Sequence, residues 1–435
     1  MQRQKATFLL EAEEIISFKS KMLNWAQPFS IFLFLDSNQY QLPHSKFECL
    51  LAVNARHFIN GSSNEDVLSK IEVWQEENKD WLFGHIVYDF KNSIEPKLVS
   101  NHPQKHGWDD VSFFSPEIIC YLQKDCKSFT IESIERLPED IFEEIVNAEL
   151  NEEPLLPKVK FKTRINKETY LKTIQKLRQH IEDGDCYEIN FCCEGFVEEV
   201  NLNPSIVFNK LNQISPAPFA AFYRNKQDYL MCASPERYLM KEKEFIRSMP
   251  IKGTIKRGEN ELEDLSRKQA LFDSEKDRAE NVMIVDLVRN DLARSCVLGT
   301  VSVEELFGVY SFPQVHHLIS TVTGELSAQH KATDAIRYSF PMGSMTGAPK
   351  MKVMELTDRY EQTRRELFSG SVGYFTPDGD FDFNVVIRSL FYNTTSKYLS
   401  YKTGGAITYD SNAEEEYEEM RLKAWALERI FDQKT

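Results

Sequence analysis

Residues Asn166 to Cys192 read NKETYLKTIQKLRQHIEDGDCYEINFC, and this stretch decides the fold class. Its first part predicts a helix, because Asn166 can cap it, Gly184 can end it, and apolar residues recur at helical spacing. Those apolar residues are Tyr170, Ile174, Leu177 and Ile181. The second part, Cys186 to Cys192, alternates with a period of two, which is typical of a strand. A helix therefore runs directly into a strand.

The segments that flank this stretch mix strands and helices without a regular order. Further strand-like runs cover residues 219–222, 229–233 and 245–251. One long helix is predicted from a cap at Asp273 or Ser274 to Arg294, and another covers residues 413–431. The second helix has an apolar stripe made by Tyr417, Met420, Ala424 and Leu427. Because no regular β-α-β alternation appears, the pattern favours an α+β fold over a doubly wound sheet.

The chain has one candidate boundary. Residues 150–162 are charged and contain Pro154 and Pro157, which is typical of a surface connection. We expect residues 1–155 to form a divergent N-terminal region of the same globular unit, and residues 156–435 to carry the chemistry. The first region has strand-like runs at 31–35 and 81–88 but no chemical motif.

Composition excludes several classes of protein. The 435 residues are 42% hydrophobic and 27% charged, as in globular proteins, and the net charge of −15 disfavours binding to nucleic acid or to anionic membranes. The apolar runs are strand-sized, and the first 18 residues lack the apolar core of a signal peptide. The eight cysteines have neither zinc-site nor disulfide spacing. We therefore expect a cytoplasmic protein that does not enter membranes.

Lys252 is a candidate amine nucleophile. It lies in Met249-Pro250-Ile251-Lys252-Gly253-Thr254-Ile255-Lys256-Arg257-Gly258, a short apolar strand-like run that is an unusual place for a lysine. Such a nucleophile must be unprotonated near neutral pH, and burial or a nearby positive charge lowers the pKa of a lysine. The alternative is a lysine whose stem packs on the protein while its ammonium reaches water.

Three glutamates are candidate metal ligands. Glu280 lies on the predicted helix that ends at Arg294, and Glu416 and Glu419 lie three residues apart on one face of the last helix. If these carboxylates converge, they can hold Mg²⁺ together with water and a substrate oxygen. The alternative for Glu419 is a surface ion pair with Lys423, four residues later.

Glycine-rich turns and one arginine complete a candidate anion site. The turns at 253–254, 343–347 and 403–406 can bring bare backbone N–H groups close to an anion. Arg388 lies in the apolar run Val385-Val386-Ile387-Arg388-Ser389-Leu390, and a guanidinium there suits bidentate recognition of a carboxylate. Together these features indicate a site for a small substrate with several carboxylates, held by a metal.

From about Thr163 to the C-terminus the chain resembles the chorismate-utilising enzymes. This family includes anthranilate synthase component I, aminodeoxychorismate synthase component I, isochorismate synthase and salicylate synthase. Six blocks occur in the family's order: Gly184–Tyr187, Ser234–Arg237, Glu280–Asp291, Phe340–Lys350, Ser369–Tyr374 and the helix with Glu416 and Glu419. The resemblance implies two orthogonally packed β-sheets between helical layers. Leu35-Asp36-Ser37 resembles the edge of a tryptophan pocket that some members have, so bound tryptophan is possible.

The resemblance also implies roles for individual residues. Glu280, Glu416 and Glu419 would bind Mg²⁺, and Glu236 would be the general acid that protonates the departing C4 hydroxyl of chorismate. His317 matches the family's active-site histidine, although His316 beside it is an alternative. The substrate site would be lined by Gly253, Thr254, Thr346, Tyr374, Arg388, Gly404, Gly405, Ala406 and Lys423. Of these, Arg388 and Tyr374 would face the enolpyruvyl carboxylate.

Two positions select among the members of the family. Water-adding members carry a general-base lysine, and ammonia-using members usually a glutamine, where this chain has Glu188. At the position of Lys252, anthranilate synthases have alanine, whereas aminodeoxychorismate synthases have a lysine that attacks C2 of chorismate before ammonia adds at C4. The resemblance thus favours amination at C4 over two alternatives, an anthranilate synthase component I and a non-catalytic relative. Met342 departs from the family's usual glycine.

The source of ammonia is expected to be separate from this chain. The only G-x-C run, Gly184-Asp185-Cys186, lacks the second glycine of a nucleophile elbow and has no His-x-Glu downstream. No fused lyase is expected after the last helix. The resemblance therefore implies a separate glutamine amidotransferase subunit as partner, or free ammonia.

Overall fold

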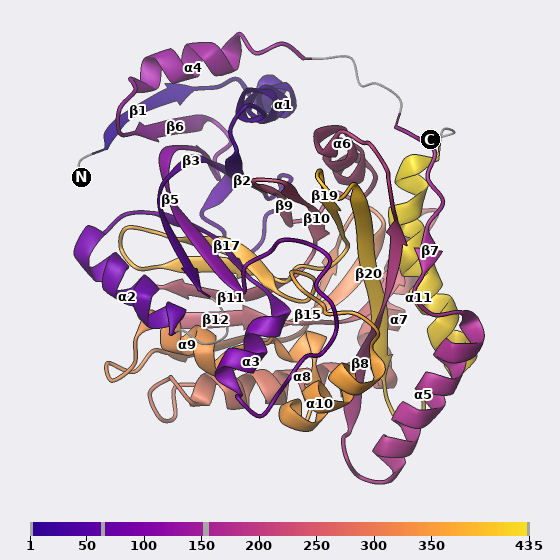
Figure 1. Ribbon diagram of the computed structural model, residues 1–435. Helices are drawn as coiled ribbons and strands as arrows, with labels where there is room; N and C mark the ends of the chain where they lie inside the picture. Colours follow the sequence, from indigo (N-terminus) through magenta and orange to yellow (C-terminus); the bar gives the residue numbers. More distant parts are fainter. Residues whose placement is uncertain (1–2, 62–65, 151–155, 433–435) are drawn as a thin grey trace.

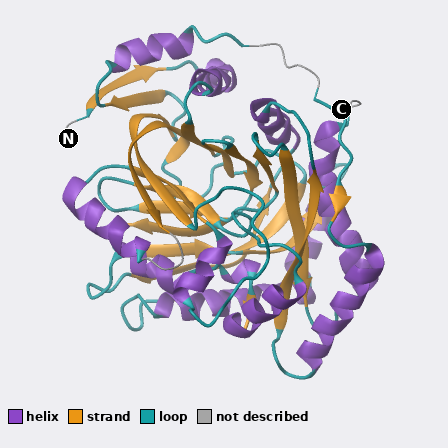
Figure 2. Cartoon of the chain, in the orientation of Figure 1, coloured by secondary structure: helices purple, strands orange, loops and turns teal. Residues whose placement is uncertain are grey.

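The computed structural model describes residues 3–61, 66–150 and 156–432. Residues 151–155 of the predicted connection lie outside the described residues. Helices cover the outer sides of a large body of antiparallel strands (Figures 1 and 2). Within the described residues, no helix is both long and apolar enough to span a bilayer.

Strand pairing defines two antiparallel sheets. In order, the first contains β1 (Gln4–Leu9), β6 (Ser128–Ser133), β5 (Val111–Gln123), β3 (Phe47–Gly61), β2 (Ile31–Asp36), β9 (Phe219–Asn225), β10 (Asp228–Ser234), β19 (Ser389–Asn393), β20 (Tyr398–Ile407) and β8 (Glu188–Val197). The short strands β7 (Lys162–Thr163) and β16 (Gly347–Ala348) also pair with β8. The pairing of β2 with β9 joins the N-terminal 155 residues to the rest of the chain.

The second sheet runs crosswise to the first in Figure 1. It contains β4 (Leu82–Ile86), β17 (Ser371–Phe375), β18 (Phe381–Asn384), β11 (Arg237–Glu242), β12 (Phe245–Met249) and β15 (Val315–Glu325), and β13 (Ile251–Lys256) and β14 (Ser302–Ser311) pair with β15. β5 connects the sheets, because residues 111–114 pair with β4 and residues 118–122 with β6. The predicted α+β class with two crossed sheets is confirmed.

The helices form the outer layers. The first sheet carries α1 (Ile15–Ala26), α4 (Pro138–Val146), α5 (Lys167–Glu182), α6 (Pro204–Ile214) and α11 (Ala413–Glu428). The second sheet and its end are covered by α2 (Val67–Asn78), α7 (Glu261–Asp273), α8 (Glu275–Ala293) and α9 (Ala332–Ser339), whereas α10 (Lys350–Tyr360) packs against β8 and β16. Short helical segments are η1 (Ala12–Glu14), η2 (Tyr88–Phe90), α3 (Lys91–Ile94), η3 (Gly343–Met345) and η4 (Arg429–Phe431).

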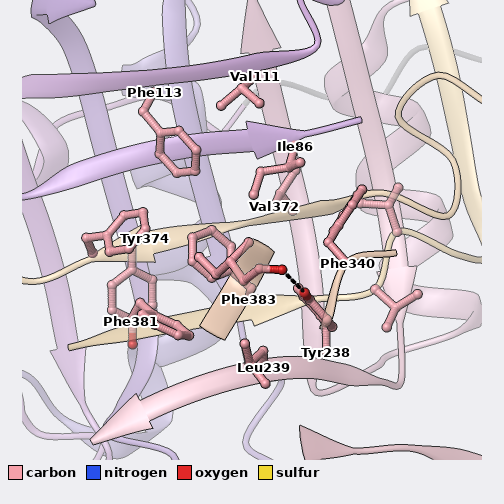
Figure 3. Close-up of a cluster of buried hydrophobic side chains, with 14 of the residues drawn as sticks. Ile86, Val111, Phe113, Tyr238, Leu239, Phe340, Val372, Tyr374, Phe381 and Phe383 are labelled. Atoms are coloured by element: carbon pink, nitrogen blue, oxygen red, sulfur yellow. Dashed lines mark hydrogen bonds between the residues drawn. The ribbon is translucent and has the colours of Figure 1, made fainter. Parts of the chain in front are cut away.

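The core lies on both faces of the first sheet. Along β2, Leu33 packs into the cluster between the sheets, whereas Phe32 and Phe34 pack under α1 and α6. Figure 3 shows part of the cluster between the sheets, where Phe113 and Phe383 meet edge to face. Each fully buried side chain of this size contributes about 1.5–3 kcal/mol to the free energy of unfolding. Burial on both faces makes the first sheet a rigid support for residues at its edge.

Two local expectations needed correction. Asn166 accepts a hydrogen bond from the Thr169 N–H, so α5 begins as predicted. The helix predicted to begin at Asp273 or Ser274 does begin with Ser274 as its cap, but α7 precedes it directly and was not predicted. The run 245–251 is two strands, β12 and β13, because Pro250 has no N–H to continue a ladder.

Candidate active site

Lys252 lies on β13 with its ammonium group enclosed by carboxylates. Its Nζ is 2.6 Å from Glu188 Oε1 on β8 and 3.6 Å from Glu280 Oε2 on α8, and the side chain is 12% exposed. Burial lowers the pKa of Lys252, but Glu188 and Glu280 outweigh it, so the pKa is raised. The expectation that the surroundings lower this pKa is therefore wrong for this arrangement. The side chain is mostly buried and its ammonium pairs with a carboxylate, which argues against the alternative of a snorkelling lysine.

Glu236 lies just before β11 and is 4% exposed. Burial raises the pKa of Glu236 to about 7, although the Ser344 hydroxyl, the Ile251 N–H and the charges of Lys252 and Arg388 oppose that rise. A small cavity beside it is lined by Ser344, Gly343 and Met342 of the turn 342–347. A buried carboxyl that stays protonated near neutral pH has the property that a general acid needs.

His317 joins two predicted site residues. Its Nδ1 is 2.8 Å from Thr254 Oγ1, and its Nε2 is 3.3 Å from an Arg388 guanidinium nitrogen. A guanidinium can only donate, so Nε2 accepts and the ring proton is on Nδ1, where it is donated to Thr254. Burial and the charge of Arg388 lower the pKa of His317, which agrees with a neutral ring.

The strand alternation of β15 separates the two neighbouring histidines. His316 points to the other face, where its Nε2 is 3.0 Å from Asp264 and its Nδ1 is 2.9 Å from Ser311 Oγ. His317, and not His316, therefore faces the candidate site. Arg388 next to it has φ +51°, a conformation that costs of order 1 kcal/mol for a residue other than glycine.

The three predicted metal ligands lie on α8 and α11. Glu280, Glu416 and Glu419 all interact with the charge of Lys276. Glu419 Oε1 is 2.7 Å from Lys423 Nζ, as the ion-pair alternative predicts, and Glu416 Oε1 accepts a 2.7 Å hydrogen bond from Ser411. Among the described residues, no three Asp, Glu, His or Cys side chains are already close enough to hold a metal ion.

The glycines of β20 bring its backbone close to neighbouring groups. Gly404 is opposite Cys192 and Ala406 opposite Asn190 on β8, and a Cβ on Gly404 would come within 2.0 Å of the Phe191 carbonyl oxygen. A Cβ on Gly405 would lie 3.1 Å from Glu416 Oε2 and 3.8 Å from Glu419 Oε1. The absence of a side chain at Gly405 therefore leaves room beside the carboxylates.

Other predicted site residues have structural contacts. Lys423 Nζ donates to the Gly404 carbonyl at 2.8 Å, which ties α11 to β20. The Thr346 hydroxyl donates within its own turn, to Met342 and Gly343 carbonyls at 3.1 and 3.2 Å. Gly253 has φ +96°, and a Cβ there would lie 3.0 Å from Asp277, so this turn requires glycine.

Tyr374 does not belong to this site, which corrects the prediction that it faces the substrate with Arg388. Its ring packs against Phe47, Trp81 and Phe83. Figure 3 shows Tyr374 within the cluster of buried hydrophobic side chains. The residue lines a separate cavity together with Leu35, Asp36 and Ser37. Tyr374 is on β17 at the far side of β18, so the sequence block that contains it does not reach Lys252.

The sequence reasoning missed the buried pair Arg365 and Glu361. Arg365 donates to Glu361, to the Met345 carbonyl at 2.7 Å and to the Asn190 carbonyl at 2.8 Å. Glu361 also accepts the N–H of Cys192. The pair therefore joins the turn 342–347 to the strand that carries Glu188. The spacing of four residues is the only signal in the sequence, and it is equally typical of a surface ion pair.

Comparisons with known proteins identify the family of the chain. The model of the chorismate binding enzyme family matches residues 31–429. Aminodeoxychorismate synthase component 1 of Escherichia coli (strain K12) is 40% identical over 259 residues, 60% of this chain and 56% of that protein. The Bacillus subtilis (strain 168) protein of the same name is 33% identical over 272 residues, 62% of this chain and 57% of that protein. The chain spans a little more than half the length of these curated relatives.

Solved structures of the same fold are also known. Anthranilate synthase component I from Streptococcus pneumoniae TIGR4 superposes with a TM-score of 0.78 at 25% identity, covering 90% of this chain and 94% of that one. The menaquinone-specific isochorismate synthase from Escherichia coli superposes with a TM-score of 0.78 at 14% identity, covering 99% and 95%. With the family model covering nearly its whole length, the chain belongs to the chorismate binding enzyme family.

Proposed function

We propose that this chain converts chorismate and ammonia into 4-amino-4-deoxychorismate, as an aminodeoxychorismate synthase component I of p-aminobenzoate and folate biosynthesis in the cytoplasm. The observation that carries the proposal is the buried ammonium of Lys252, 2.6 Å from Glu188 and enclosed with the buried carboxyl of Glu236 in one site. The relatives at 33 and 40% identity are both aminodeoxychorismate synthase component 1 proteins.

The proposed reaction has two displacement steps. The neutral amine of Lys252 forms a bond to C2 of chorismate, the ring double bond shifts, and the C4 hydroxyl leaves as water with the proton of Glu236. Ammonia then forms a bond to C4, the double bond shifts back, and the lysine leaves C2. The ammonium formed at C4 returns one proton to Glu236, so the net change is replacement of the hydroxyl by an amino group, with release of water. Lys252 must lose its proton to Glu188 or to solvent before the first step.

Substrate binding is assigned to the positively charged end of the site. The guanidinium of Arg388 uses one nitrogen to contact the neutral ring of His317. Its remaining N–H donors suit a carboxylate of chorismate. The backbone of Gly404 to Ala406 borders the same space. The unprotonated Nε2 of His317 accepts from Arg388 and helps to keep the guanidinium in place, while Nδ1 donates to Thr254.

Mg²⁺ is proposed as cofactor, held by Glu280, Glu416 and Glu419. The donor types suit this ion, because carboxylates are its usual ligands in proteins and Gly405 leaves room beside Glu416 and Glu419. When bound, Mg²⁺ would neutralise a carboxylate of the substrate. The carboxylate of Glu419 would then contact both Lys423 and the ion, and that of Glu280 would contact both Lys252 and the ion.

A protein partner and a small-molecule ligand are proposed in addition to Mg²⁺. A separate glutamine amidotransferase would supply ammonia. The cavity lined by Leu35, Asp36 and Ser37 is the place where tryptophan would bind.

Anthranilate synthase component I is the second candidate, because a solved structure of that name superposes over 90% of the chain. Lys252 argues against it, since amination at C2 needs that position open to ammonia. A third possibility is a relative that binds chorismate without turnover. The test is to supply chorismate, Mg²⁺ and ammonium and to identify the product by mass spectrometry. Aminodeoxychorismate supports the proposal, anthranilate with pyruvate overturns it, and no turnover with an amidotransferase added supports the third possibility.

A further inference from the structure

Arg237 follows Glu236 directly and is 1% exposed. Its guanidinium makes a two-pronged contact with Asp382 at 2.9 and 3.0 Å, and donates to the Pro43 carbonyl at 3.1 Å and to Ser45 Oγ at 3.2 Å. The guanidinium carbon also lies 4.9 Å from the centre of the Phe219 ring. Such a forked set of contacts holds a side chain in one orientation, which a lysine cannot reproduce.

The strand ladder is irregular directly after Arg237, although Arg237 itself pairs with Met249 on β12 and with Asn384 on β18. The pairing of β11 with β12 shifts register between Arg237 and Met240, and its pairing with β18 shifts between Arg237 and Leu239. The pairing of β11 with both β12 and β18 is therefore irregular directly after Arg237. The backbone of Glu236 makes two hydrogen bonds: its carbonyl accepts the Val385 N–H at 3.0 Å, and its N–H donates to Ser234 Oγ at 3.2 Å.

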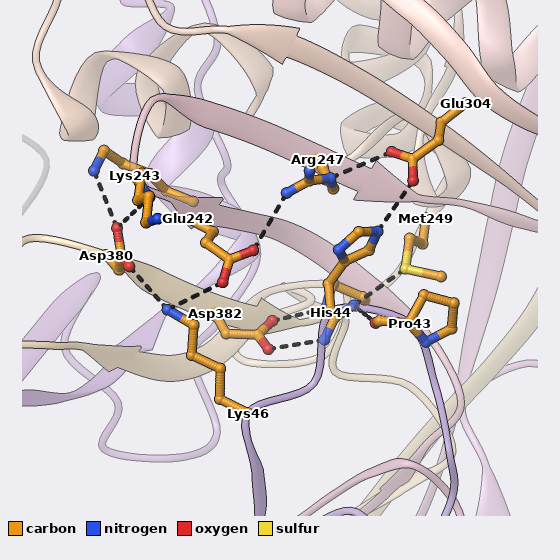
Figure 4. A network of polar contacts seen from close by, with 12 residues as sticks. Pro43, His44, Lys46, Glu242, Lys243, Arg247, Met249, Glu304, Asp380 and Asp382 are labelled. Atoms are coloured by element: carbon orange, nitrogen blue, oxygen red, sulfur yellow. Dashed lines mark hydrogen bonds and ion pairs between the residues drawn. The ribbon is translucent and has the colours of Figure 1, made fainter.

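The loop that Arg237 grips is itself anchored. His44 Nε2 is 3.2 Å from Glu304, and Lys46 Nζ is 2.9 Å from Asp380 and 3.5 Å from Glu242. Figure 4 shows Pro43 and Asp382 converging within this network, which links the N-terminal region to β11, β12, β14 and the end of β18. The anchor of Arg237 is thus rigid and lies outside the catalytic residues.

We propose that Arg237 is the positioning residue for Glu236, and that its grip on Asp382 and on residues 43–45 keeps the Glu236 carboxyl in its buried place against the substrate. This rests on the proposed role of Glu236 as general acid. The N-terminal region, which carries no chemical motif, then takes part in catalysis by anchoring Arg237.

We call the contacts of Arg237 with Asp382 and residues 43–45 the clamp. Loosening of the clamp should be detectable through the pKa of Glu236. Lys252 from β13 and Arg388 before β19 act on it with positive charge, and Asp291 from α8 lines the same cavity. Burial is the largest influence on its pKa. If the clamp loosens, water reaches the carboxyl and its pKa falls, so the rate declines at lower pH than in the wild type.

The test compares Arg237→Lys with Arg247→Lys. Arg247 on β12 pairs with Glu304 and Glu242 in the same network but is not adjacent to Glu236, so it is the matched control. For Arg237→Lys we expect kcat to fall about tenfold, KM for chorismate to change less than about threefold, and the descending limb of the pH profile of kcat to move about one unit lower. Arg247→Lys should keep the wild-type profile. An unchanged kcat and limb in folded Arg237→Lys would overturn the proposal, as would equal effects of the two variants.

Asp382→Asn is the second variant, because it releases one arm of the clamp without adding volume. It decides the question if Arg237→Lys does not fold, and the same direction of shift is expected. The Glu236 carboxyl band, assigned with Glu236→Gln, is also titrated by infrared spectroscopy in the wild type and the variants. This readout does not need turnover. A wild type that makes another product or none defeats the proposed function, whereas an unmoved carboxyl titration defeats the positioning role.

Discussion

The ammonium of Lys252 and the carboxylate of Glu188 form a buried ion pair with 2.6 Å between Nζ and Oε1. The pair joins β13 of the second sheet to β8 at the edge of the first. It holds the proposed nucleophile in its charged form, because the carboxylate raises the pKa of Lys252. Glu188 therefore opposes the loss of the proton that the reaction needs.

Replacement of Glu188 by glutamine should shift the pH dependence of amination. Removal of the carboxylate lowers the pKa of Lys252, so the ascending limb of the rate should move to lower pH by about one unit or more. Activity at neutral pH should be kept or increased. The measurement is the pH profile of kcat/KM for chorismate with saturating ammonium. A loss of about 100-fold would instead mean that Glu188 is needed to accept the proton.

Replacement of Lys252 by alanine should abolish or greatly slow amination at C4. The variant lacks the amine that attacks C2, and only uncatalysed or C2 chemistry remains. In the wild type, chorismate given without ammonia should add mass to the peptide that contains Lys252. Formation of aminodeoxychorismate at the wild-type rate in the variant would end the nucleophile hypothesis.

Sequence patterns predicted the elements that local residues determine. The cap at Asn166 and the stripe from Tyr170 to Ile181 placed α5 to within two residues. The sequence pattern predicted α8 but not α7 before it, because Ser274 both ends α7 and caps α8. Alternation along a strand also separates His316 from His317, although only the pairing with β13 shows which face is the site.

Contacts between residues far apart in sequence could be found only in the structure. Glu188 and Lys252 are far apart in sequence, and no local rule pairs them. Tyr374 follows two glycines in a motif-like block, yet the antiparallel pairing with β4 and β18 directs it to the core and away from Arg388. The raised pKa of Lys252 is likewise a balance between burial, which lowers it, and three carboxylates from different elements, which raise it. Resemblance named the residues, and packing decided their electrostatics.

Glu236→Gln should lower kcat by about 10²–10⁴-fold, since it removes the proton donor for the C4 hydroxyl. The acid works in its protonated form and the pKa of Glu236 is raised to about 7, so the wild-type rate should decline as the pH rises through about 7. The variant should lose this descending limb. Glu242→Gln, which alters an ion pair on the other end of β11, should retain it. A descending limb that persists in Glu236→Gln would assign it to another group.

Tyr374→Phe should leave KM for chorismate within about twofold of the wild type, because its ring packs in a different cavity. Arg388→Lys should raise KM about tenfold or more, since a lysine loses the planar donors that suit a carboxylate. Steady-state kinetics with both variants separate the two positions. A large rise in KM for Tyr374→Phe would return the tyrosine to the chorismate site.

Lys19→Met should destabilise the fold by about 3–5 kcal/mol, because it leaves two buried carboxylates without their counter-ion. Lys19 Nζ lies 2.6 Å from Asp36 and 2.5 Å from Glu48, and Glu48 also accepts the Ser37 hydroxyl. Urea unfolding at pH 7 measures the change in the free energy of unfolding. Lys21→Met on the same helix is the matched control, because it removes only an exposed hydrogen bond to the Val146 carbonyl, and it should cost under about 1 kcal/mol. Equal costs for the two variants would show that the buried carboxylates find other partners or take up protons, and the loop from Ser37 would then not depend on Lys19.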